Sequence, residues 1–473
     1  MHRKHRFSIT NQSGFGWFRT GYRFRGGCSV RVDNRSLRLE IENQMKLHGY
    51  SLNKVAELTR INAGNLSMVL NGRARAMTIG HLDALAEVFG KPPGWLYELY
   101  TEECISDNKL SRPRMIPYLV RCAETGRVDC IEPVVSKILD NPKNVSIIFS
   151  AAEKLYENGR LDESARFYQL VVDNIKDNFS EFMAISQYRL FLIAQGTDEE
   201  KNWKSVIQFE PFRRRLPEYL QLAALLKLAK VCYSLEKWDE VEKFAQELSE
   251  LSSILYKLKM VEEVSVERHL VYYFGMGLLF EGAVLEKRGL YQEAKKVVQH
   301  YADLSWFEPL NESAWQDVER FKVYAQANLY TLEVLMGNDD ILNEYADYLE
   351  GLDQLNEILS GLETIIKSAN THGFCVDHVL RRFAEAIDRF DCFLDDLINS
   401  RRYLWFCYHR AVYEFTKERF ENGIKETLFC ISLCLEMKRY EDLARCVALF
   451  EKHRNYASEA QIQYYESIRL WVV

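Results

Sequence analysis

The residues of this 473-residue chain that are best suited to chemistry by type and spacing lie between Ser51 and Gly72, in the stretch SLNKVAELTRINAGNLSMVLNG. Ser51 can cap one helix, and Asn62 can cap a second helix after a tight turn. The start of that second helix then presents small, hydroxyl and amide side chains outward. Such side chains can hydrogen-bond to base edges in the major groove of DNA. The pattern therefore predicts a helix-turn-helix whose DNA-facing residues are Asn62, Ala63, Gly64, Asn65, Ser67 and Met68.

Three further helices are expected to position this pair. Leu37 to Leu47 has a helical apolar period and is closed by His48-Gly49. Thr78 caps a fourth helix that ends at Gly90, and a fifth helix begins at Trp95 after a pair of prolines. Five short helices within residues 35–100 predict a compact all-α DNA-binding domain.

These residues resemble the lambda-repressor/Cro-type helix-turn-helix family, also called the XRE family. The match covers Ser51, Val-Ala-Glu at 55–57, Leu66-Ser67, the Asn-Gly-Arg turn at 71–73 and HLDALAEVFG at 81–90. The resemblance implies that Lys54, Arg73 and Arg75 lie near DNA phosphates. Ala63 and Gly64 stand where the family often has Gln, Ser or Thr, which favours readout of DNA shape over direct base contacts.

Charge is divided unevenly along the chain. Residues 1–100 carry 15 Lys and Arg against 7 Asp and Glu, whereas the remainder carries 46 basic against 61 acidic residues. A basic head on an acidic body fits contact with nucleic acid by the head alone.

Residues 1–34 are expected to form a basic disordered leader. Residues 1–32 contain seven Lys and Arg, no acid, and interleaved glycines and aromatic residues without a helical or strand period. The segment is either a flexible arm that adds phosphate contacts or a leader upstream of the working domain.

Other classes of function lack their motifs. No apolar run approaches the ~20 residues that span a bilayer, and the basic N-terminus has no apolar core of a signal peptide, so we expect a cytoplasmic protein without a membrane partner. No HExxH, GxSxG, P-loop or GxGxxG motif occurs. We therefore expect no catalytic residue, metal or cofactor. The eleven cysteines have no metal-ligand spacing, which favours buried thiols over a redox switch.

After an expected linker at 101–115, residues 116–473 read as helix pairs. One pattern recurs in GRLDESARFY (159–168), EKWDEVEKFA (236–245), RGLYQEAKKV (288–297) and ERFENGIKET (418–427). Each has a polar or Gly turn, a large apolar residue and an acid-rich cap. This resembles a degenerate tetratricopeptide repeat array, which implies an all-α solenoid.

Polar and aromatic side chains interrupt the expected first helices of these pairs. Amides can clamp an extended peptide backbone, Arg can hold a carboxylate, and Tyr can pack peptide side chains. For each residue the alternative is ordinary packing or a surface ion pair. The candidates for a peptide-binding concave face are Gln187, Tyr188, Arg189, Arg268, Tyr272, Tyr324, Asn328 and Tyr408.

An XRE-type head on such a body resembles the Rgg, PlcR, PrgX, NprR and Rap group of peptide-pheromone receptors of Gram-positive bacteria. The resemblance implies quorum sensing: a homodimer binds a pseudo-palindromic double-stranded operator, and a short peptide in the concave groove controls the geometry of the dimer. The alternative is a DNA-binding adaptor whose repeat body docks a protein such as an antirepressor.

Overall fold

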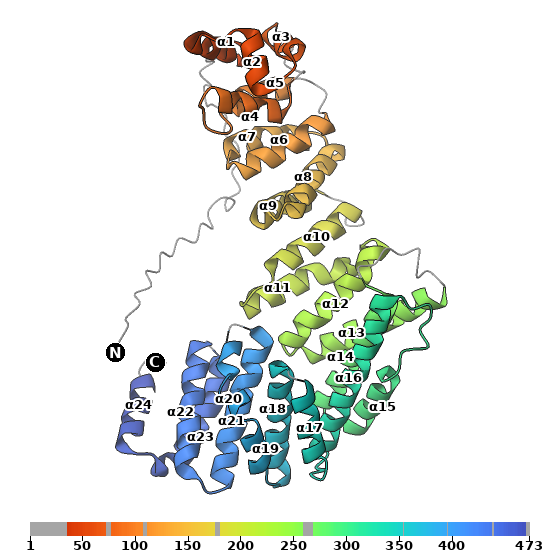
Figure 1. Ribbon diagram of the computed structural model, residues 1–473, viewed down its shortest axis with the longest axis vertical. Coiled ribbons are helices and arrows are strands. Elements are labelled where there is room, and N and C mark those ends of the chain that lie inside the picture. Colours follow the sequence, from red (N-terminus) through yellow and green to blue (C-terminus); the bar gives the residue numbers. More distant parts are fainter. Residues whose placement is uncertain are drawn as a thin grey trace. The chain divides into compact units, whose positions relative to one another are not determined.

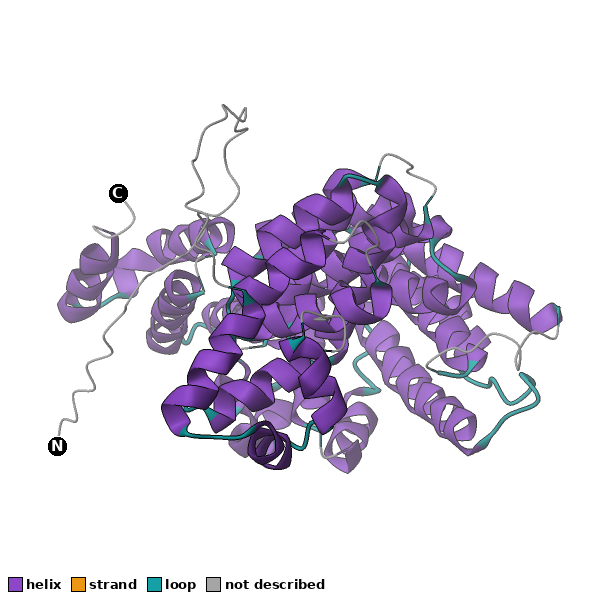
Figure 2. Ribbon diagram, turned by 90° about the horizontal axis from the view of Figure 1, so that it is seen from above, coloured by secondary structure: helices purple, strands orange, loops and turns teal. Residues whose placement is uncertain are grey.

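The computed structural model describes residues 36–71, 77–106, 111–175, 180–258, 268–352, 354–394, 396–437 and 439–469. The expected leader at 1–34 lies outside these residues. The chain divides into two compact units, one of residues 1–110 with 127–133 and one of residues 111–126 with 134–473. Within the described residues the fold is all helix and loop, with no strand (Figure 2). The predicted fold class, a helix-turn-helix head followed by a helical repeat region, is confirmed.

The first unit contains the five expected helices of the head, at the red end of the chain in Figure 1. They are α1 (Leu37–His48), α2 (Leu52–Thr59), α3 (Ala63–Leu70), α4 (Ile79–Val88) and α5 (Tyr97–Ser106).

The predicted caps start and stop these helices. Ser51 accepts a hydrogen bond from the Lys54 backbone N–H at 3.3 Å, and the Thr78 side chain accepts one from the His81 N–H at 3.3 Å. His81 completes a capping box because its Nδ1 accepts from the Thr78 N–H. Gly49 ends α1 in the left-handed conformation that its missing Cβ permits.

The last helix of the head is longer than the sequence suggested. Helix α5 continues to Ser106, and α6 begins at Arg112, so helices occupy most of the stretch 101–115 that we expected to be a linker. Two hydrogen bonds hold α5 to the head: the Tyr100 hydroxyl donates to the Met77 carbonyl, and the Tyr97 hydroxyl donates to Asp83. Pro113 does not break α6, because a proline fits the first turn of a helix, where its missing N–H has no partner to lose.

The repeat body follows in helices that range from orange to blue in Figure 1. Its first part comprises α6 (Arg112–Glu124), α7 (Val128–Leu139), η2 (Pro142–Asn144), α8 (Val145–Glu157), α9 (Leu161–Asn174), α10 (Glu181–Ala194), α11 (Glu199–Phe209), η3 (Glu210–Arg215), α12 (Glu218–Ser234), α13 (Trp238–Lys257), α14 (Leu270–Lys287) and α15 (Tyr291–Tyr301). It continues with α16 (Glu312–Leu335), α17 (Leu342–Leu352), α18 (Leu355–His372), α19 (Asp377–Arg382), α20 (Ala384–Ile387), η4 (Phe390–Phe393), α21 (Leu397–Thr416), α22 (Phe420–Glu436), α23 (Tyr440–His453), η5 (Arg454–Tyr456) and α24 (Glu459–Arg469).

The recurring sequence pattern marks the turn inside each helix pair. The large apolar residue of the pattern is the first residue of α9, α13, α15 and α22. Two positions earlier the backbone has a positive φ, at Gly159, Glu236, Gly289 and Glu418. The next N–H then reaches back into the preceding helix, as from Arg160 to the Leu155 carbonyl at 2.9 Å. This C-terminal turn reverses the chain, so that α8 packs on α9, α12 on α13, α14 on α15 and α21 on α22.

Stacked pairs bury apolar cores in the body, of which two extend over the described residues after Ser180. One runs from Ala184 to Leu332, and the next from Tyr330 to Tyr465. Helices α13 and α14 approach closely at Gly277, where an added Cβ would lie 2.8 Å from the Ala245 carbonyl oxygen. Each pair covers the apolar face of its neighbour, which a single pair cannot do alone.

Candidate DNA-binding interface and repeat-body sites

The turn between α2 and α3 is built by local hydrogen bonds. Thr59 is buried, and its hydroxyl donates to the Val55 carbonyl at 2.7 Å and accepts from the Ile61 N–H at 3.3 Å. Arg60 takes the positive φ of 56° that reverses the chain. Asn62 then caps α3 by accepting from the Gly64 N–H at 2.8 Å. These bonds fix the angle at which α3 leaves the turn.

The inward face of α3 is apolar, and its outward face is polar. Leu66 and Val69 are buried in the head. Asn62 and Gly64 are exposed, Met68 is 39% exposed, and Ala63, Asn65 and Ser67 are half-buried. The predicted DNA-facing residues of α3 therefore share the side of the helix that the core leaves uncovered.

Several polar groups of this side have weak contacts or none within the protein. Among the described residues, Asn65 makes no side-chain hydrogen bond. Ser67 accepts a long one, 3.4 Å, from the Asn71 amide. Lys54 is half-exposed and pairs with the exposed Glu57 at 3.1 Å, a surface contact worth little. These donors and acceptors can therefore turn to base edges and phosphates at small cost.

Gly64 has a structural reason to lack a side chain. An added Cβ would lie 2.9 Å from the capping oxygen of Asn62, closer than normal contact. The departure from larger polar residues at this position therefore preserves the N-cap of α3. Arg73 and Arg75, expected near phosphates, lie outside the described residues.

Residues 40–102 match the family model of the Cro/C1-type helix-turn-helix DNA-binding domain. The chain carries a DNA-binding head. The predicted XRE-type head is thereby confirmed, and the protein is a DNA-binding transcription regulator. The matched residues end within α5.

The other comparisons add little. No curated protein matches the chain. One matching solved structure is described as a "Circular tandem repeat protein with novel repeat topology and enhanced subunit contact surfaces". The match covers 91% of this chain and 99% of that one at 11% identity, with a TM-score of 0.20.

In the repeat body, three of the candidate peptide residues gather between α14 and α16. The Arg268 guanidinium lies 4.0 Å from the centre of the Tyr272 ring. Tyr272 packs near Phe321, and Phe321 packs near Tyr324, with ring centres 6.4 and 6.1 Å apart. Arg268 also donates to Asp317, so its charge is already balanced within the chain.

Asp317 was not singled out from the sequence, yet it is central to this cluster. It is 1% exposed, and Arg268 and Arg320 both donate to its Oδ1, at 2.5 and 2.7 Å. Its Oδ2 is buried without a hydrogen-bond partner. An acid near the start of α16, three residues before Arg320, was the available signal in the sequence.

The candidates on α10 lie in a second group. Arg189 donates to both carboxylate oxygens of Glu153, at 3.2 and 3.1 Å, and its guanidinium stands 4.4 Å from the Tyr156 ring centre. Tyr188 is 5% exposed and packs on Phe209 inside the core. Gln187 is half-buried.

The last two candidates lie elsewhere. The Asn328 amide donates to the hydroxyl of the buried Tyr301 at 2.6 Å. Tyr408 on α21 is half-buried between Trp405 and His409. The eight candidates are thus spread over α10, α14 with α16, and α21.

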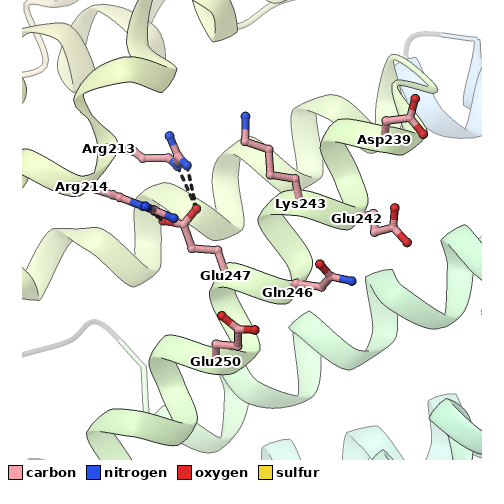
Figure 3. A pocket seen from close by; sticks show the side chains of 8 residues that line it. All are labelled: Arg213, Arg214, Asp239, Glu242, Lys243, Gln246, Glu247 and Glu250. Atoms are coloured by element: carbon pink, nitrogen blue, oxygen red, sulfur yellow. Dashed lines mark hydrogen bonds and ion pairs between the residues drawn. The ribbon is translucent and has the colours of Figure 1, made fainter.

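A pocket of about 320 Å³ lies beside α13 and η3 and is lined by charged side chains (Figure 3). Arg213 and Arg214 converge on Glu247, at 2.9 and 2.7 Å. Burial favours the neutral acid, but the hydrogen bonds from Arg214 and Arg213 outweigh it and hold the pKa of Glu247 below its usual value. Arg288 pairs with Asp239 and Glu242 at the other end. Most of these charges are paired within the chain.

Two further observations bear on chemistry. Among the described residues, no group of three or more His, Cys, Asp or Glu is placed to hold a metal ion, and no helix is long and apolar enough to cross a membrane. Cys407, Cys430, Cys434 and Cys446 are buried, and burial raises the pKa of the Cys407 thiol to about 12. Thiols of this kind are unreactive, so these four cysteines fit the buried-thiol interpretation. Cys375 and Cys392 are exposed, so the interpretation is wrong for these two.

Proposed function

We propose that this transcription regulator is controlled by a short peptide that binds its repeat body. In this proposal the protein acts as a homodimer whose two heads read the half-sites of a pseudo-palindromic operator. Peptide binding changes the spacing of the heads and therefore the fit to DNA. Half-sites then lie about one helical turn, ~34 Å, apart or a multiple of it.

The observation that carries the proposal is the cluster of Arg268, Tyr272 and Tyr324 with Asp317. Tyrosine rings can pack against the side chains of an extended peptide, and a carboxylate can accept hydrogen bonds from its unpaired backbone N–H groups. The Asp317 Oδ2 is buried and has no hydrogen-bond partner, at a cost of about 1–3 kcal/mol. A peptide N–H or ammonium group would supply the missing donor once the side chains that cover Asp317, which is 1% exposed, move aside.

The head supports the DNA side of the proposal. Asn65 and Ser67 offer amide and hydroxyl groups, whereas Ala63 and Gly64 offer only backbone and a small surface. Few direct base contacts make the spacing of two heads more important for specificity. A repeat body that controls the spacing of the two heads then regulates DNA binding effectively.

The candidate peptide is sought first. It is the short C-terminal tail of a leader peptide that a small open reading frame beside the gene encodes. Isothermal titration of the full chain with this tail peptide measures binding. A duplex selected from a random library then measures DNA affinity with and without the peptide. Heat of binding together with a changed DNA affinity supports the proposal. No heat and no change would leave a DNA-binding adaptor whose body docks a protein.

A further inference from the structure

Arg402, in the first turns of α21, differs from other half-buried arginines of the repeat body. Arg189 pairs with Glu153 at 3.1 Å, Arg410 with Glu426 at 2.5 Å, and Arg439 with Asp442 at 2.6 Å. Around Arg402, no carboxylate of the described residues lies within ion-pair distance. Half-buried guanidinium groups are normally paired, because water no longer solvates them fully.

The hydrogen bonds of Arg402 are also weak. Its Nη1 faces Asn399 Oδ1 and its Nη2 faces the Tyr233 hydroxyl, both at 3.4 Å. A guanidinium has five N–H donors, and N–H···O bonds at this length are near the limit of the interaction. Most of the donor capacity of Arg402 is therefore open to another acceptor.

Two more cations lie around the same point. The Arg401 side chain is only 14% exposed and donates to the Ser234 carbonyl at 3.2 Å, and its Nε is buried without a partner. Lys287, at the end of α14, interacts electrostatically with Arg402 and has Glu286 as its nearest carboxylate, at 3.6 Å. Helices α14 and α21 thus carry three cations in this region. Arg401 pairs with Glu236 at 3.5 Å and Lys287 with Glu286 at 3.6 Å, whereas Arg402 has no ion pair among the described residues.

The neighbouring helix α18 carries acidic residues, but their carboxylates are too far from the Arg402 guanidinium to form an ion pair. Glu357 and Glu363 act on Arg402 only through longer-range attraction, and Glu363 lies 3.8 Å from His409. Burial, with help from Lys367 and Lys287, lowers the pKa of His409 to about 4, so the ring is neutral at pH 7.

We propose that Arg402 and Lys287 bind a carboxylate group, with Tyr233 and Arg401 as positioning residues. A carboxylate matches the planar fork of a guanidinium and can accept two parallel N–H bonds. Resting on the proposed function, we assign the group to the C-terminal carboxylate of the peptide. Arg189 and Arg268, which the sequence suggested for this role, already hold Glu153 and Asp317.

The first experiment tests the site without any peptide. The thermal midpoint of the full chain is measured in sodium succinate and in sodium chloride of equal ionic strength, for the native chain, Arg402→Gln and Lys287→Gln. Lys322→Gln is the matched control, because Lys322 is exposed and its one ion pair with a described residue is with Glu319 in the preceding turn. We expect succinate to stabilise the native chain and the control, with an apparent affinity about tenfold weaker in either site variant.

The result that overturns the proposal is an equal response to succinate in the native chain, Arg402→Gln and Lys287→Gln. An equal lack of response in all of them also overturns it. If one of the two site variants does not fold, the other variant still tests the proposal.

The second experiment identifies the source of the carboxylate. The tail peptide is titrated as the free acid and as the C-terminal amide. We expect the amide to bind the native chain about tenfold more weakly, and the two forms to bind Arg402→Gln equally. Equal binding of acid and amide to the native chain contradicts the assignment to the peptide terminus but leaves peptide control standing. A succinate effect without binding of either peptide supports the carboxylate site and contradicts peptide control.

Discussion

Asn65 on α3 is half-buried, with a side-chain amide that bonds to no described residue. We predict that Asn65→Ala weakens binding to a selected duplex by about tenfold, because an amide that pairs with a base edge contributes about 1–3 kcal/mol of discrimination. The thermal midpoint stays unchanged. Asn43→Ala removes an exposed amide from α1 and serves as the control. Normal operator binding by Asn65→Ala would show that this residue does not face the bases.

Asn328 combines a proposed role in peptide response with a structural one. Its amide is the hydrogen-bond partner of the buried Tyr301 hydroxyl. Asn328→Ala is expected to lose about 1–2 kcal/mol of stability and the peptide response, with DNA binding intact. In the double variant with Tyr301→Phe the stability returns, because no buried hydroxyl is left unpaired. If the peptide response returns with it, Asn328 does not contact the peptide.

His409 predicts a pH dependence of stability. Its pKa in the folded chain is about 4, below the ordinary 6.5, because of burial and then of Lys367 and Lys287. The unfolded chain therefore binds more protons between these values, so stability is full above pH 6.5 and falls as the pH drops toward 4. We expect a loss of about 2–3 kcal/mol over this window. His409→Gln flattens the profile in acid denaturation, whereas the exposed His300→Gln does not.

At the residue scale, the sequence identified side-chain types but not their partners. Arg189 and Arg268 were chosen because arginine binds carboxylates, and both bind one within the chain. Their partners, Glu153 and Asp317, lie 36 and 49 residues away. Only the stacking of helices brings such residues together, so no local pattern reveals them. Arg402 could not be recognised from the sequence for the same reason, because what distinguishes it is that no carboxylate of the described residues lies within ion-pair distance.

At the element scale, close packing of helices predicts opposite effects for two glycines. An Ala at Gly275 in α14 would place its Cβ 2.4 Å from the Phe321 ring of α16. We expect Gly275→Ala to destabilise the repeat body by about 1–3 kcal/mol. Gly351 in α17 has no neighbour within 4 Å, and Gly351→Ala is expected to be neutral or to stabilise by about 0.5 kcal/mol. Chemical denaturation measures the free energy of unfolding of the two variants. Equal changes in this free energy would contradict the packing described here.

The elements were largely predictable, since each depends on local signals. A helix begins at each of Leu161, Trp238, Tyr291 and Phe420. A residue in the left-handed conformation lies two positions before each of them, and an acid-rich first turn follows. The end of the head was not predictable in this way. The polar stretch after Tyr100 resembled a linker, but tertiary hydrogen bonds of the preceding tyrosines hold α5 in place.

At the scale of the whole molecule, charge separates the two functions. Residues 1–100 carry a net charge of +8 (15 − 7) and the remainder −15 (46 − 61), so DNA is attracted to the head and repelled from the body. In the proposed dimer, the body acts on DNA only through the position of the heads. Binding of peptide and binding of operator must then be linked, and each changes the affinity for the other by the same factor.

The affinity of the full-length protein for its selected duplex, with and without saturating tail peptide, measures this linkage most directly. Peptide control predicts that the Kd for the duplex with two half-sites changes by about tenfold or more, while the Kd for a single half-site stays constant. A duplex Kd that changes by less than about twofold at saturating peptide would contradict control of the head by the body.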